Sequence, residues 1–403
     1  MNRIGILINS LEGGGAQTQA LHLMKGLIDA DIDVYLILLD KNKDILPSEN
    51  IEKVLILTEI DTKANTLKKT VTFPLQWKNL KKIIKELNIS IIISFMERAN
   101  ILNLLSFDSH KKILRSSTNI ASALPFKPPL KRYLIKLFYP LLLNKANTIV
   151  FNSKGVAQKF SEVFYVDKKK VKIIYNICDI DKIKKDAKEP LPEKFSYLFK
   201  KKTIITVGRL VHAKGHWHLL RIFKKLCEKE KDLQLIIIGD GPLKDYLNTL
   251  SLQLCIQDKV FFAGFQKNPI SWISRADLFV LTSIWEGFPN VLLEAMAIGI
   301  PVISTDCFSG PREILDPNSE FSKKTKKLEL APFGILTPAL DGKKYAYNEP
   351  LTYEEKIFMD GIERLLTDKN LRESYAKRSV KRAEDFSFKK IIPKWIDLIK
   401  CAE

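Results

Sequence analysis

Residues 283–310 read SIWEGFPNVLLEAMAIGIPVISTDCFSG, and Glu286 and Glu294 stand within them with seven residues between the two. Gly287 and Pro289 interrupt the chain directly after Glu286, which predicts that this carboxylate lies on a loop. The apolar run around Glu294 predicts a helix, and a carboxylate near its start can accept hydrogen bonds from sugar hydroxyls. Taken alone, Glu294 would more often be a residue that caps its own helix. The surrounding sequence decides between these interpretations.

The flanks of this stretch predict where the two carboxylates lie in a fold. Buried strands are expected on both sides, over 278–281 and 301–304. Asn290 is a candidate N-cap, which would leave the amides of Asn290 and Val291 without partners inside the helix. Together with the helix dipole, such amides favour an anion, for example a phosphate. The loop and the helix end are therefore expected at the carboxyl end of a parallel strand, where open α/β sheets bind ligands.

Apolar runs of strand length alternate with helical patterns along the 403 residues, which predicts two α/β domains with doubly wound parallel sheets. In the first half we expect strands over 4–9, 34–39, 51–57, 89–95, 112–114, 148–152 and 171–175. In the second half we expect them over 203–207, 233–238, 260–262, 278–281, 301–304 and 333–338. The expected divisions are an N-terminal domain 1–182, a linker 183–202, a C-terminal domain 203–375 and C-terminal helices 376–403 that cross back to the N-terminal domain.

Two further loops carry residues suited to an anion. Arg209 and Lys214 lie five apart after the strand 203–207, inside the string GRLVHAKG. Both side chains can reach the same phosphates, Arg through a bidentate fork and Lys as a point charge. A glycine turn around Gly14 and Gly15 precedes the first helix, a position that binds anions in many α/β domains. Such a turn is also found where a strand and a helix merely pack closely.

The spacing of Glu286 and Glu294, together with the V-G-R and K-G strings of the 207–215 loop, resembles the retaining glycosyltransferases of family 4. The resemblance extends over nearly the whole chain and is strongest over 203–315. It implies the GT-B fold, in which two Rossmann-like domains face each other across a cleft. It also implies retaining transfer of a hexose or N-acetylhexosamine from a nucleotide sugar, with UDP as the expected nucleotide, to a lipid-linked saccharide, as in bacterial O-antigen and surface-polysaccharide assembly.

The resemblance assigns roles to individual residues. Arg209 and Lys214 would neutralise the leaving diphosphate, and Glu286 would face the donor sugar as the third catalytic group. Glu294 would hold the ribose of the nucleotide. The other donor-binding positions implied are Gly208, Gly239, Asp240, Gly241, Phe265, Phe288, Pro289, Asn290 and Val291.

In the N-terminal domain, the resemblance places Gly14 and Gly15 over the phosphate and the acceptor. Many family members carry a histidine on the loop that here reads RSSTN, residues 115–119, and this chain has none there. Ser117 or Asn119 would then take the place of that histidine in orienting the sugar.

Neither a metal ion nor another cofactor is expected, since the nucleotide sugar is a co-substrate. Asp-x-Asp strings that could hold Mn²⁺ occur at 31–33 and 179–181. The first is expected on the amino side of its sheet, away from the ligand edge, and the second as a helix cap. Both are therefore predicted to be structural.

The composition is strongly basic, with a net charge of +19. Nucleic acid is disfavoured, because the chain lacks zinc-finger spacing, an RNP-like motif and a helix-turn-helix pattern. Its five scattered cysteines include no C-x-x-C pair, which indicates reduced thiols in a cytosolic protein.

Segment 126–145, FKPPLKRYLIKLFYPLLLNK, interleaves basic with aromatic and aliphatic residues. Pro140 is expected to kink or end its helix. A basic aromatic helix too short to span a bilayer suits an anionic membrane surface, and it would also suit a helix packed on the first domain. On the first interpretation the protein is peripheral on the inner face of the cytoplasmic membrane.

Two other function classes were compared with the transferase. A UDP-sugar 2-epimerase of the same architecture would need acid and base carboxylates and a histidine in the cleft, and the five histidines form no convincing set. A basic membrane or nucleic-acid-binding module without catalysis would not need the four charged residues assigned above. The transferase is therefore preferred.

Overall fold

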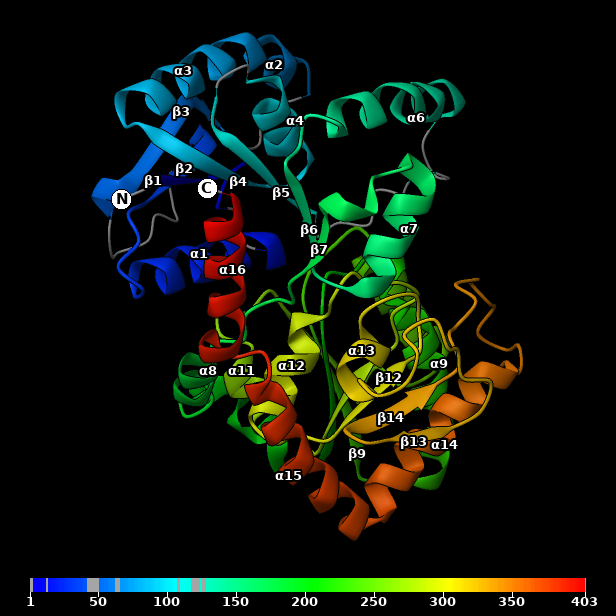
Figure 1. The fold of residues 1–403 in the computed structure, drawn as a ribbon. Helices are drawn as coiled ribbons and strands as arrows, with labels where there is room; N and C mark the ends of the chain where they lie inside the picture. Colours follow the sequence, from blue (N-terminus) through cyan, green and yellow to red (C-terminus); the bar gives the residue numbers. More distant parts are fainter. Residues whose placement is uncertain are drawn as a thin grey trace. The chain divides into compact units, whose positions relative to one another are not determined.

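The computed structural model describes residues 3–11, 14–41, 51–61, 66–106, 109–116, 124 and 128–402 (Figure 1). The chain forms two compact units. The N-terminal unit is Met1–Ile177 together with Phe388–Glu403, and the C-terminal unit is Cys178–Ser387. Residues 183–202, expected as a linker, thus belong to the C-terminal unit, and of the expected returning helices only the last one joins the N-terminal unit.

The sheet of the N-terminal unit contains seven parallel strands in the order β3-β2-β1-β4-β5-β6-β7. The strands are β1 (Arg3–Ile8), β2 (Val34–Lys41), β3 (Val54–Asp61), β4 (Ile89–Phe95), β5 (Lys111–Ser116), β6 (Thr148–Phe151) and β7 (Val171–Ile173). The helices described in this unit are α1 (Gly15–Ile28), α2 (Thr66–Val71), α3 (Phe73–Glu86), α4 (Glu97–Leu105), α6 (Pro129–Leu143), α7 (Lys154–Phe164) and α16 (Phe388–Ala402), with 3-10 turns η1 (Ile51–Lys53) and η3 (Lys168–Lys170).

The sheet of the C-terminal unit has the order β10-β9-β8-β11-β12-β14-β13, and its strands are parallel except for the edge strand β13. The strands are β8 (Lys202–Val207), β9 (Leu233–Ile238), β10 (Val260–Gly264), β11 (Leu278–Leu281), β12 (Val302–Thr305), β13 (Glu329–Ala331) and β14 (Gly334–Thr337). The helices are α8 (Ile180–Asp186), α9 (His216–Lys229), α10 (Lys244–Gln253), α11 (Ile270–Ile273), α12 (Asn290–Ala297), α13 (Pro311–Leu315), α14 (Tyr353–Thr367) and α15 (Lys369–Glu384), with 3-10 turns η4 (Glu193–Lys200) and η5 (His212–Lys214).

Both faces of the N-terminal sheet are buried, as the apolar strand runs predict. Ile6 of β1 packs in one cluster with Leu23 of α1 and Ile391 of α16. Leu7, the next residue, packs in another cluster with Leu80 of α3. Successive side chains of a strand point to opposite faces, so this division shows helices packed on each side of the sheet. The doubly wound parallel architecture expected from the sequence is confirmed.

At Pro140 a kink or an end was expected, and the helix α6 does not end there but continues to Leu143. The residue at i−4, Lys136, lies on an exposed part of the helix, where water can satisfy the carbonyl that proline leaves unpaired. Asn290 is the first residue of α12 and not its N-cap, because Pro289 occupies the cap position.

Candidate functional site

Glycines bring the loops after β8 and β9 together at the carboxyl edge of the C-terminal sheet. The amide of Gly208 donates to Ile238 O at 2.9 Å. A Cβ on Gly239 would lie 2.0 Å from Gly208 O, and one on Gly241 would lie 2.6 Å from Leu210 O. Gly239 also has a φ of +137°, a conformation that other residues rarely adopt. These positions therefore require glycine for backbone to pack on backbone.

Asp240 and Phe265, two of the expected donor-binding residues, lie at the surface of the same edge. Asp240 is exposed, and its Oδ1 accepts a hydrogen bond from the amide of Gly241 at 2.7 Å. Lys244 Nζ lies 3.9 Å from its other oxygen. Phe265, after β10, is 75% exposed, so its ring is available to a planar ligand.

Lys214 and Glu286 come from different loops and form a hydrogen-bonded ion pair. Lys214 Nζ lies 2.5 Å from Glu286 Oε1, and Ser283 Oγ donates to the same oxygen at 2.6 Å. The side chains of the pair are 19% and 11% exposed. Thr282 Oγ1 also donates to Lys214 O at 3.1 Å, so the loops after β8 and β11 hold each other in place. The structure thus brings these two predicted catalytic residues together.

Arg209 begins the loop that carries Lys214. Its side chain is exposed, and no hydrogen bond or ion pair joins it to another residue in the described part of the chain. An exposed guanidinium without a protein partner is available to an anion.

Helix α12 places Glu294 in a half-buried position. Burial, with a smaller contribution from the Asp186 carboxylate of α8, raises the pKa of Glu294 from 4.5 to about 7. Among the described residues, none donates a hydrogen bond to its carboxylate, so the proposed helix-capping role is not observed. A ligand hydroxyl would supply the missing donor.

The residues between Glu286 and Glu294 differ in exposure. Phe288 is buried at 6% and packs against Phe386, with ring centroids 5.5 Å apart. Pro289 is the N-cap of α12, and Val291, in its first turn, is half-buried. Phe288 therefore contributes backbone and not its ring to the edge of the sheet.

The predicted sites of the N-terminal unit are described only in part. Gly14 is the N-cap of α1 and Gly15 is its first residue. A Cβ on Gly14 would lie 2.8 Å from Gln17 Oε1, the end of a flexible side chain, so close packing does not by itself require glycine there. Ser117 and Asn119 lie outside the described residues.

One aspartate of each Asp-x-Asp string makes contacts within the protein. Asp33 pairs with Arg3 at 2.9 Å and with Lys53 at 3.1 Å, on the amino side of the sheet. Asp179 caps α8 by accepting from the amide of Lys182 at 3.1 Å. In the described ranges, no group of three or more His, Cys, Asp and Glu side chains could hold a metal ion.

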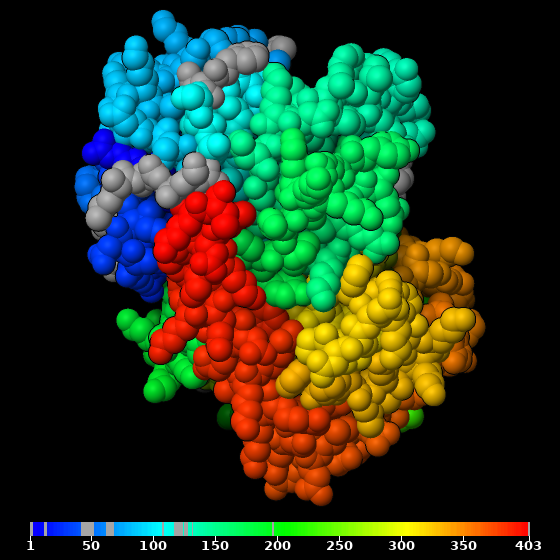
Figure 2. Space-filling view, in the orientation of Figure 1, coloured from blue at the N-terminus to red at the C-terminus, as the bar shows by residue number. Residues whose placement is uncertain are grey.

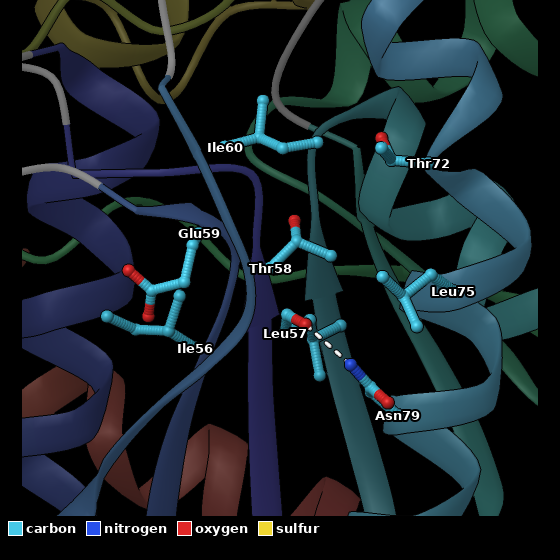
Figure 3. A pocket seen from close by; sticks show the side chains of 8 residues that line it. All are labelled: Ile56, Leu57, Thr58, Glu59, Ile60, Thr72, Leu75 and Asn79. Atoms are coloured by element: carbon cyan, nitrogen blue, oxygen red, sulfur yellow. Dashed lines mark hydrogen bonds between the residues drawn. The ribbon is translucent and has the colours of Figure 1, made fainter.

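A cavity of about 430 Å³ opens at the edge of the N-terminal sheet, between β3 and α3 (Figure 3). Asn79 donates to Leu57 O at 2.7 Å across it, and Leu75 lies on its rim. None of the residues assigned to the site lines this cavity.

Several residues that support the site were missed from the sequence. Ser283 binds Glu286, and the His212 ring packs between Trp217 and Trp285 at centroid distances of 5.0 and 5.6 Å. His212 Nε2 also lies 3.0 Å from Gly342 O, on the loop after β14. These side chains lie in loops, where no helical or strand periodicity in the sequence marks them. Their partners come from distant parts of the chain and become neighbours only when the protein folds.

The fold defines a protein of two Rossmann-like units, and the charged loop residues lie after parallel strands of the second one. A model described as Glycosyltransferase Family 4 matches residues 13–182, and one described as Glycosyl transferases group 1 matches 187–329. An uncharacterised glycosyltransferase of Methanocaldococcus jannaschii is 34% identical over 332 residues, which cover 79% of this chain and 81% of the relative. The chain belongs to this glycosyltransferase family, so the resemblance seen in the sequence is confirmed.

Two further likenesses cover almost the entire chain. A Campylobacter jejuni enzyme is 29% identical over 398 residues, 97% of each chain; its name is N-acetylgalactosamine-N,N'-diacetylbacillosaminyl-diphospho-undecaprenol 4-alpha-N-acetylgalactosaminyltransferase. The structure of Anabaena HepE, in complex with UDP and glucose, matches with a TM-score of 0.73 and 18% identity over 100% of both chains. The structural likeness confirms the GT-B fold class.

Proposed function

We propose that this glycosyltransferase transfers a hexose or an N-acetylhexosamine from a UDP-sugar to a lipid-linked saccharide, with retention of the anomeric configuration. The observation that carries the proposal is the Lys214–Glu286 pair beside the exposed Arg209. The names of the similar proteins support it, since one is crystallised with UDP and glucose and another acts on a diphospho-undecaprenol saccharide.

The two cations would act on the leaving group. When the bond between the anomeric carbon and the diphosphate oxygen breaks, negative charge develops on UDP. Arg209 and Lys214 lie on the loop after β8 and would stabilise that charge from fixed positions. Because Lys214 is already held by Glu286 and by its backbone, little reorganisation would be needed on binding.

The two carboxylates would bind hydroxyl groups. Glu286 accepts from Lys214 and Ser283 through Oε1, which leaves Oε2 for a hydroxyl of the donor sugar. Glu294 has no described donor and would accept from the ribose. With seven residues between them, Glu286 would bind the sugar from the loop and Glu294 would bind the nucleotide from the helix that follows it.

Retention follows from attack on the face that UDP leaves. The acceptor oxygen would bond to the anomeric carbon as the carbon–diphosphate bond breaks, and the acceptor proton would pass to the departing diphosphate. No protein side chain need take up that proton. Glu286, already engaged by Lys214 and Ser283, would be a binding group rather than a general base.

Turnover without a metal ion is part of the proposal, because two basic side chains offer the charge that a metal would otherwise supply. Activity should persist in excess EDTA. Loss of activity in EDTA that Mn²⁺ restores would contradict this prediction.

Peripheral contact with an anionic membrane, at the inner face of the cytoplasmic membrane, is a further part of the proposal. Figure 2 shows α6 at the surface of the N-terminal unit. It has six exposed large apolar side chains, namely Leu130, Tyr133, Leu134, Leu137, Phe138 and Leu141. Basic side chains alternate with them, a composition that suits an interfacial helix. Among the described residues, no helix is both long and apolar enough to span a bilayer.

One experiment tests donor, acceptor and stereochemistry together. Purified protein is incubated with UDP-glucose, UDP-galactose and their 2-acetamido counterparts, each with polyprenyl-diphosphate saccharides extracted from bacterial membranes. We expect sugar transfer from one of these donors and an α-linked product by NMR of the anomeric proton. An inverted product would refute retention, and transfer only to soluble sugars would refute the acceptor class.

The histidines of the chain disfavour the 2-epimerase. His110, His216 and His218 are buried, and burial lowers the pKa of His110 and His216 to about 3. His212 is committed to Gly342 O and His22 contacts Ile177 O. None of the five is therefore placed as an exposed acid or base beside Glu286.

A further inference from the structure

A buried ion pair closes a turn directly after β12. Arg312 Nη2 lies 2.7 Å from Asp306 Oδ2, and Arg312 Nε lies 3.1 Å from each oxygen of that carboxylate. The side chains are 2% and 0% exposed. A buried guanidinium and carboxylate joined by several hydrogen bonds permit little movement of the chain between them. We call residues 306–312 the Asp306–Arg312 turn.

This turn packs on residues 286–289, the donor loop. Phe308 O accepts a hydrogen bond from the amide of Glu286 at 3.3 Å. Ser309 Oγ donates to Gly287 O at 3.0 Å. Phe308 and Ser309 of the turn therefore hold the backbone that carries the Glu286 carboxylate.

Gly310 brings the turn into the closest contact with the donor loop. It has a φ of +95°, and a Cβ there would lie 2.6 Å from Pro289 Cδ. No space remains for the donor loop to shift toward the turn. A side chain at position 310 would consequently press on the donor loop.

A third segment, residues 316–329, holds the turn from outside, and we call it the strap. Figure 2 shows this part of the chain, in yellow, at the surface of the C-terminal unit. Its last residue, Glu329, lies 2.9 Å from Arg312 Nη2. The hydrogen bonds from Arg312 and Lys323 lower the pKa of Glu329 to about 2, so the carboxylate is charged throughout the working range of pH.

The strap also contacts the start of the turn. The amide of Thr325 donates to Asp306 Oδ2 at 2.8 Å, and Lys324 Nζ donates to Cys307 O at 3.1 Å. Asp306 thus accepts from both its own turn and the strap. The contacts form a continuous chain from the strap through the turn to the donor loop.

We infer that Asp306, Arg312 and the strap are positioning elements for donor-sugar recognition, acting through the donor loop on Glu286. The inference rests on the proposed role of Glu286. None of these residues needs to touch the donor. Their contribution is to keep the Glu286 carboxylate at the distance and angle that a sugar hydroxyl requires.

The affinity for a UDP-sugar relative to UDP tests this inference, because UDP lacks the sugar that Glu286 would bind. The probes are UDP and one UDP-sugar, and the affinity of each is measured by calorimetry. The UDP-sugar is whichever of UDP-glucose, UDP-galactose and their 2-acetamido counterparts binds the wild-type protein most tightly. Arg312→Lys keeps the charge but loses the fork. We expect it to weaken UDP-sugar binding about 10-fold to 100-fold more than UDP binding, which corresponds to the loss of one hydrogen bond to the Glu286 carboxylate.

Two further variants keep the result interpretable if Arg312→Lys folds poorly. Ser309→Ala removes only one hydrogen bond between the turn and the donor loop, and it should shift the affinity ratio in the same direction by a smaller factor. Arg221→Lys is the matched control. Arg221 is a buried arginine that engages the Glu355 carboxylate at 3.0 and 3.2 Å and the carbonyl of Ala346 at 2.7 Å, none of them in the turn, the strap or the donor loop, so its ratio should equal that of wild type.

The variant Glu286→Gln distinguishes a failure of the inference about the turn from a failure of the proposed function of Glu286. An unchanged affinity ratio in Glu286→Gln would refute the proposed role of Glu286. A changed ratio in Glu286→Gln with a wild-type ratio in both Arg312→Lys and Ser309→Ala would overturn the inference about the turn and leave the proposed function standing.

Discussion

Lys214 pairs with a carboxylate of the protein and is proposed to stabilise the leaving group as well. Its ammonium contacts Glu286 at 2.5 Å and retains hydrogen-bonding capacity for a phosphate oxygen. Arg209, exposed on the same loop, supplies the second charge. We predict that Arg209→Ala and Lys214→Ala each lower kcat about 10²–10³-fold, as loss of one preorganised donor does elsewhere. Initial rates at saturating donor measure the effect.

Lys202→Ala is the matched control for these variants. Lys202 begins β8, at the amino end of the strand whose carboxyl end leads to Arg209, and it pairs with Glu230 at 2.7 Å. The substitution removes the same charge, but it does so at the opposite edge of the sheet from Arg209 and Lys214. Wild-type kcat is expected for Lys202→Ala, and wild-type kcat for Lys214→Ala would rule out the diphosphate role.

Glu294 is expected to link pH to stability and, on the proposed role, to nucleotide binding. Its pKa is about 7 in the folded chain and near 4.5 when unfolded. Between these values the native state holds a proton that the unfolded state has lost, so stability falls as pH rises through this window. Glu294→Gln should remove that loss and raise stability at pH 8 on the order of 1–2 kcal/mol relative to wild type.

The same variant should lose affinity for UDP, because an amide cannot replace both acceptor oxygens of the carboxylate. Thermal unfolding at pH 5 and pH 8, with and without UDP, measures both effects. We expect a gain in melting temperature that appears only at the higher pH and a UDP-induced shift that is smaller than in wild type. A variant with the full UDP shift would contradict ribose binding by Glu294.

Some residues of the candidate site could be predicted from the sequence, and others could not. Lys214 and Glu286 could be found because each lies in a short string of loop residues with a recognisable spacing. Arg312 could not, since its partner Glu329 lies on β13, 17 residues further along the chain, and the burial of its pair with Asp306 is visible only after folding. Arginines are mostly solvent-exposed in proteins, so nothing in the sequence around Arg312 predicted that it is buried.

At the scale of elements, α6 departs most from an ordinary surface helix. Phe138 is 54% exposed and Leu141 is 61% exposed, while Tyr139, on another side of the helix, is buried against Phe160 and Phe164. The sequence left two interpretations open, a membrane-facing helix and a helix packed on its domain. The structure shows one side packed and an apolar side that no described part of the chain covers.

Charge reversal tests membrane attachment through α6. Arg132 and Lys136 are exposed, and each basic side chain near an anionic surface contributes about 1 kcal/mol. Arg132→Glu with Lys136→Glu should therefore weaken binding to phosphatidylglycerol vesicles at least about 10-fold. Transfer to a short water-soluble acceptor should stay at the wild-type rate. Vesicle co-sedimentation and the transfer assay measure the two outcomes.

Lys377→Glu with Lys381→Glu on α15 is the control. Both lysines are exposed, and the charge change is identical, but no large apolar side chain is exposed on that helix. Equal loss of vesicle binding in the two double variants would assign the attraction to net charge alone. Unchanged binding in the α6 variant would refute the role of that helix.

At the scale of the whole molecule, the alternation of strands and helices was enough to predict two doubly wound sheets. The strands are short apolar runs bounded by glycines and charges, and this local pattern survives folding. The antiparallel strand β13 was not expected, because Glu329–Ala331 is too short and too polar to show a pattern. The return of the last helix, α16, to the N-terminal unit was expected, whereas residues 376–387, which were expected to return with it, stay in the C-terminal unit.

Gly26 of α1 is the point at which the last helix meets the first. A Cβ there would lie 2.2 Å from Ile392 Cδ1, and the neighbouring α16 residues Trp395 and Ile399 are buried. Helix propensity alone predicts that Gly26→Ala stabilises the chain by about 1 kcal/mol. Overpacking at a buried contact costs about 1–3 kcal/mol, and displacement of α16 would expose further apolar surface. We therefore predict net destabilisation, measured by urea unfolding.

Removing the opposing side chain separates the clash from other effects of the substitution. Ile392→Ala alone should destabilise the chain by about 2–4 kcal/mol through the lost burial. In the double variant Gly26→Ala with Ile392→Ala, the added methyl has room where the isoleucine stood. The double variant should be more stable than the sum of the two single effects predicts, with a coupling of at least about 1 kcal/mol. Strict additivity, or a Gly26→Ala variant more stable than wild type, would mean that α16 does not pack on α1 as closely as the structure shows.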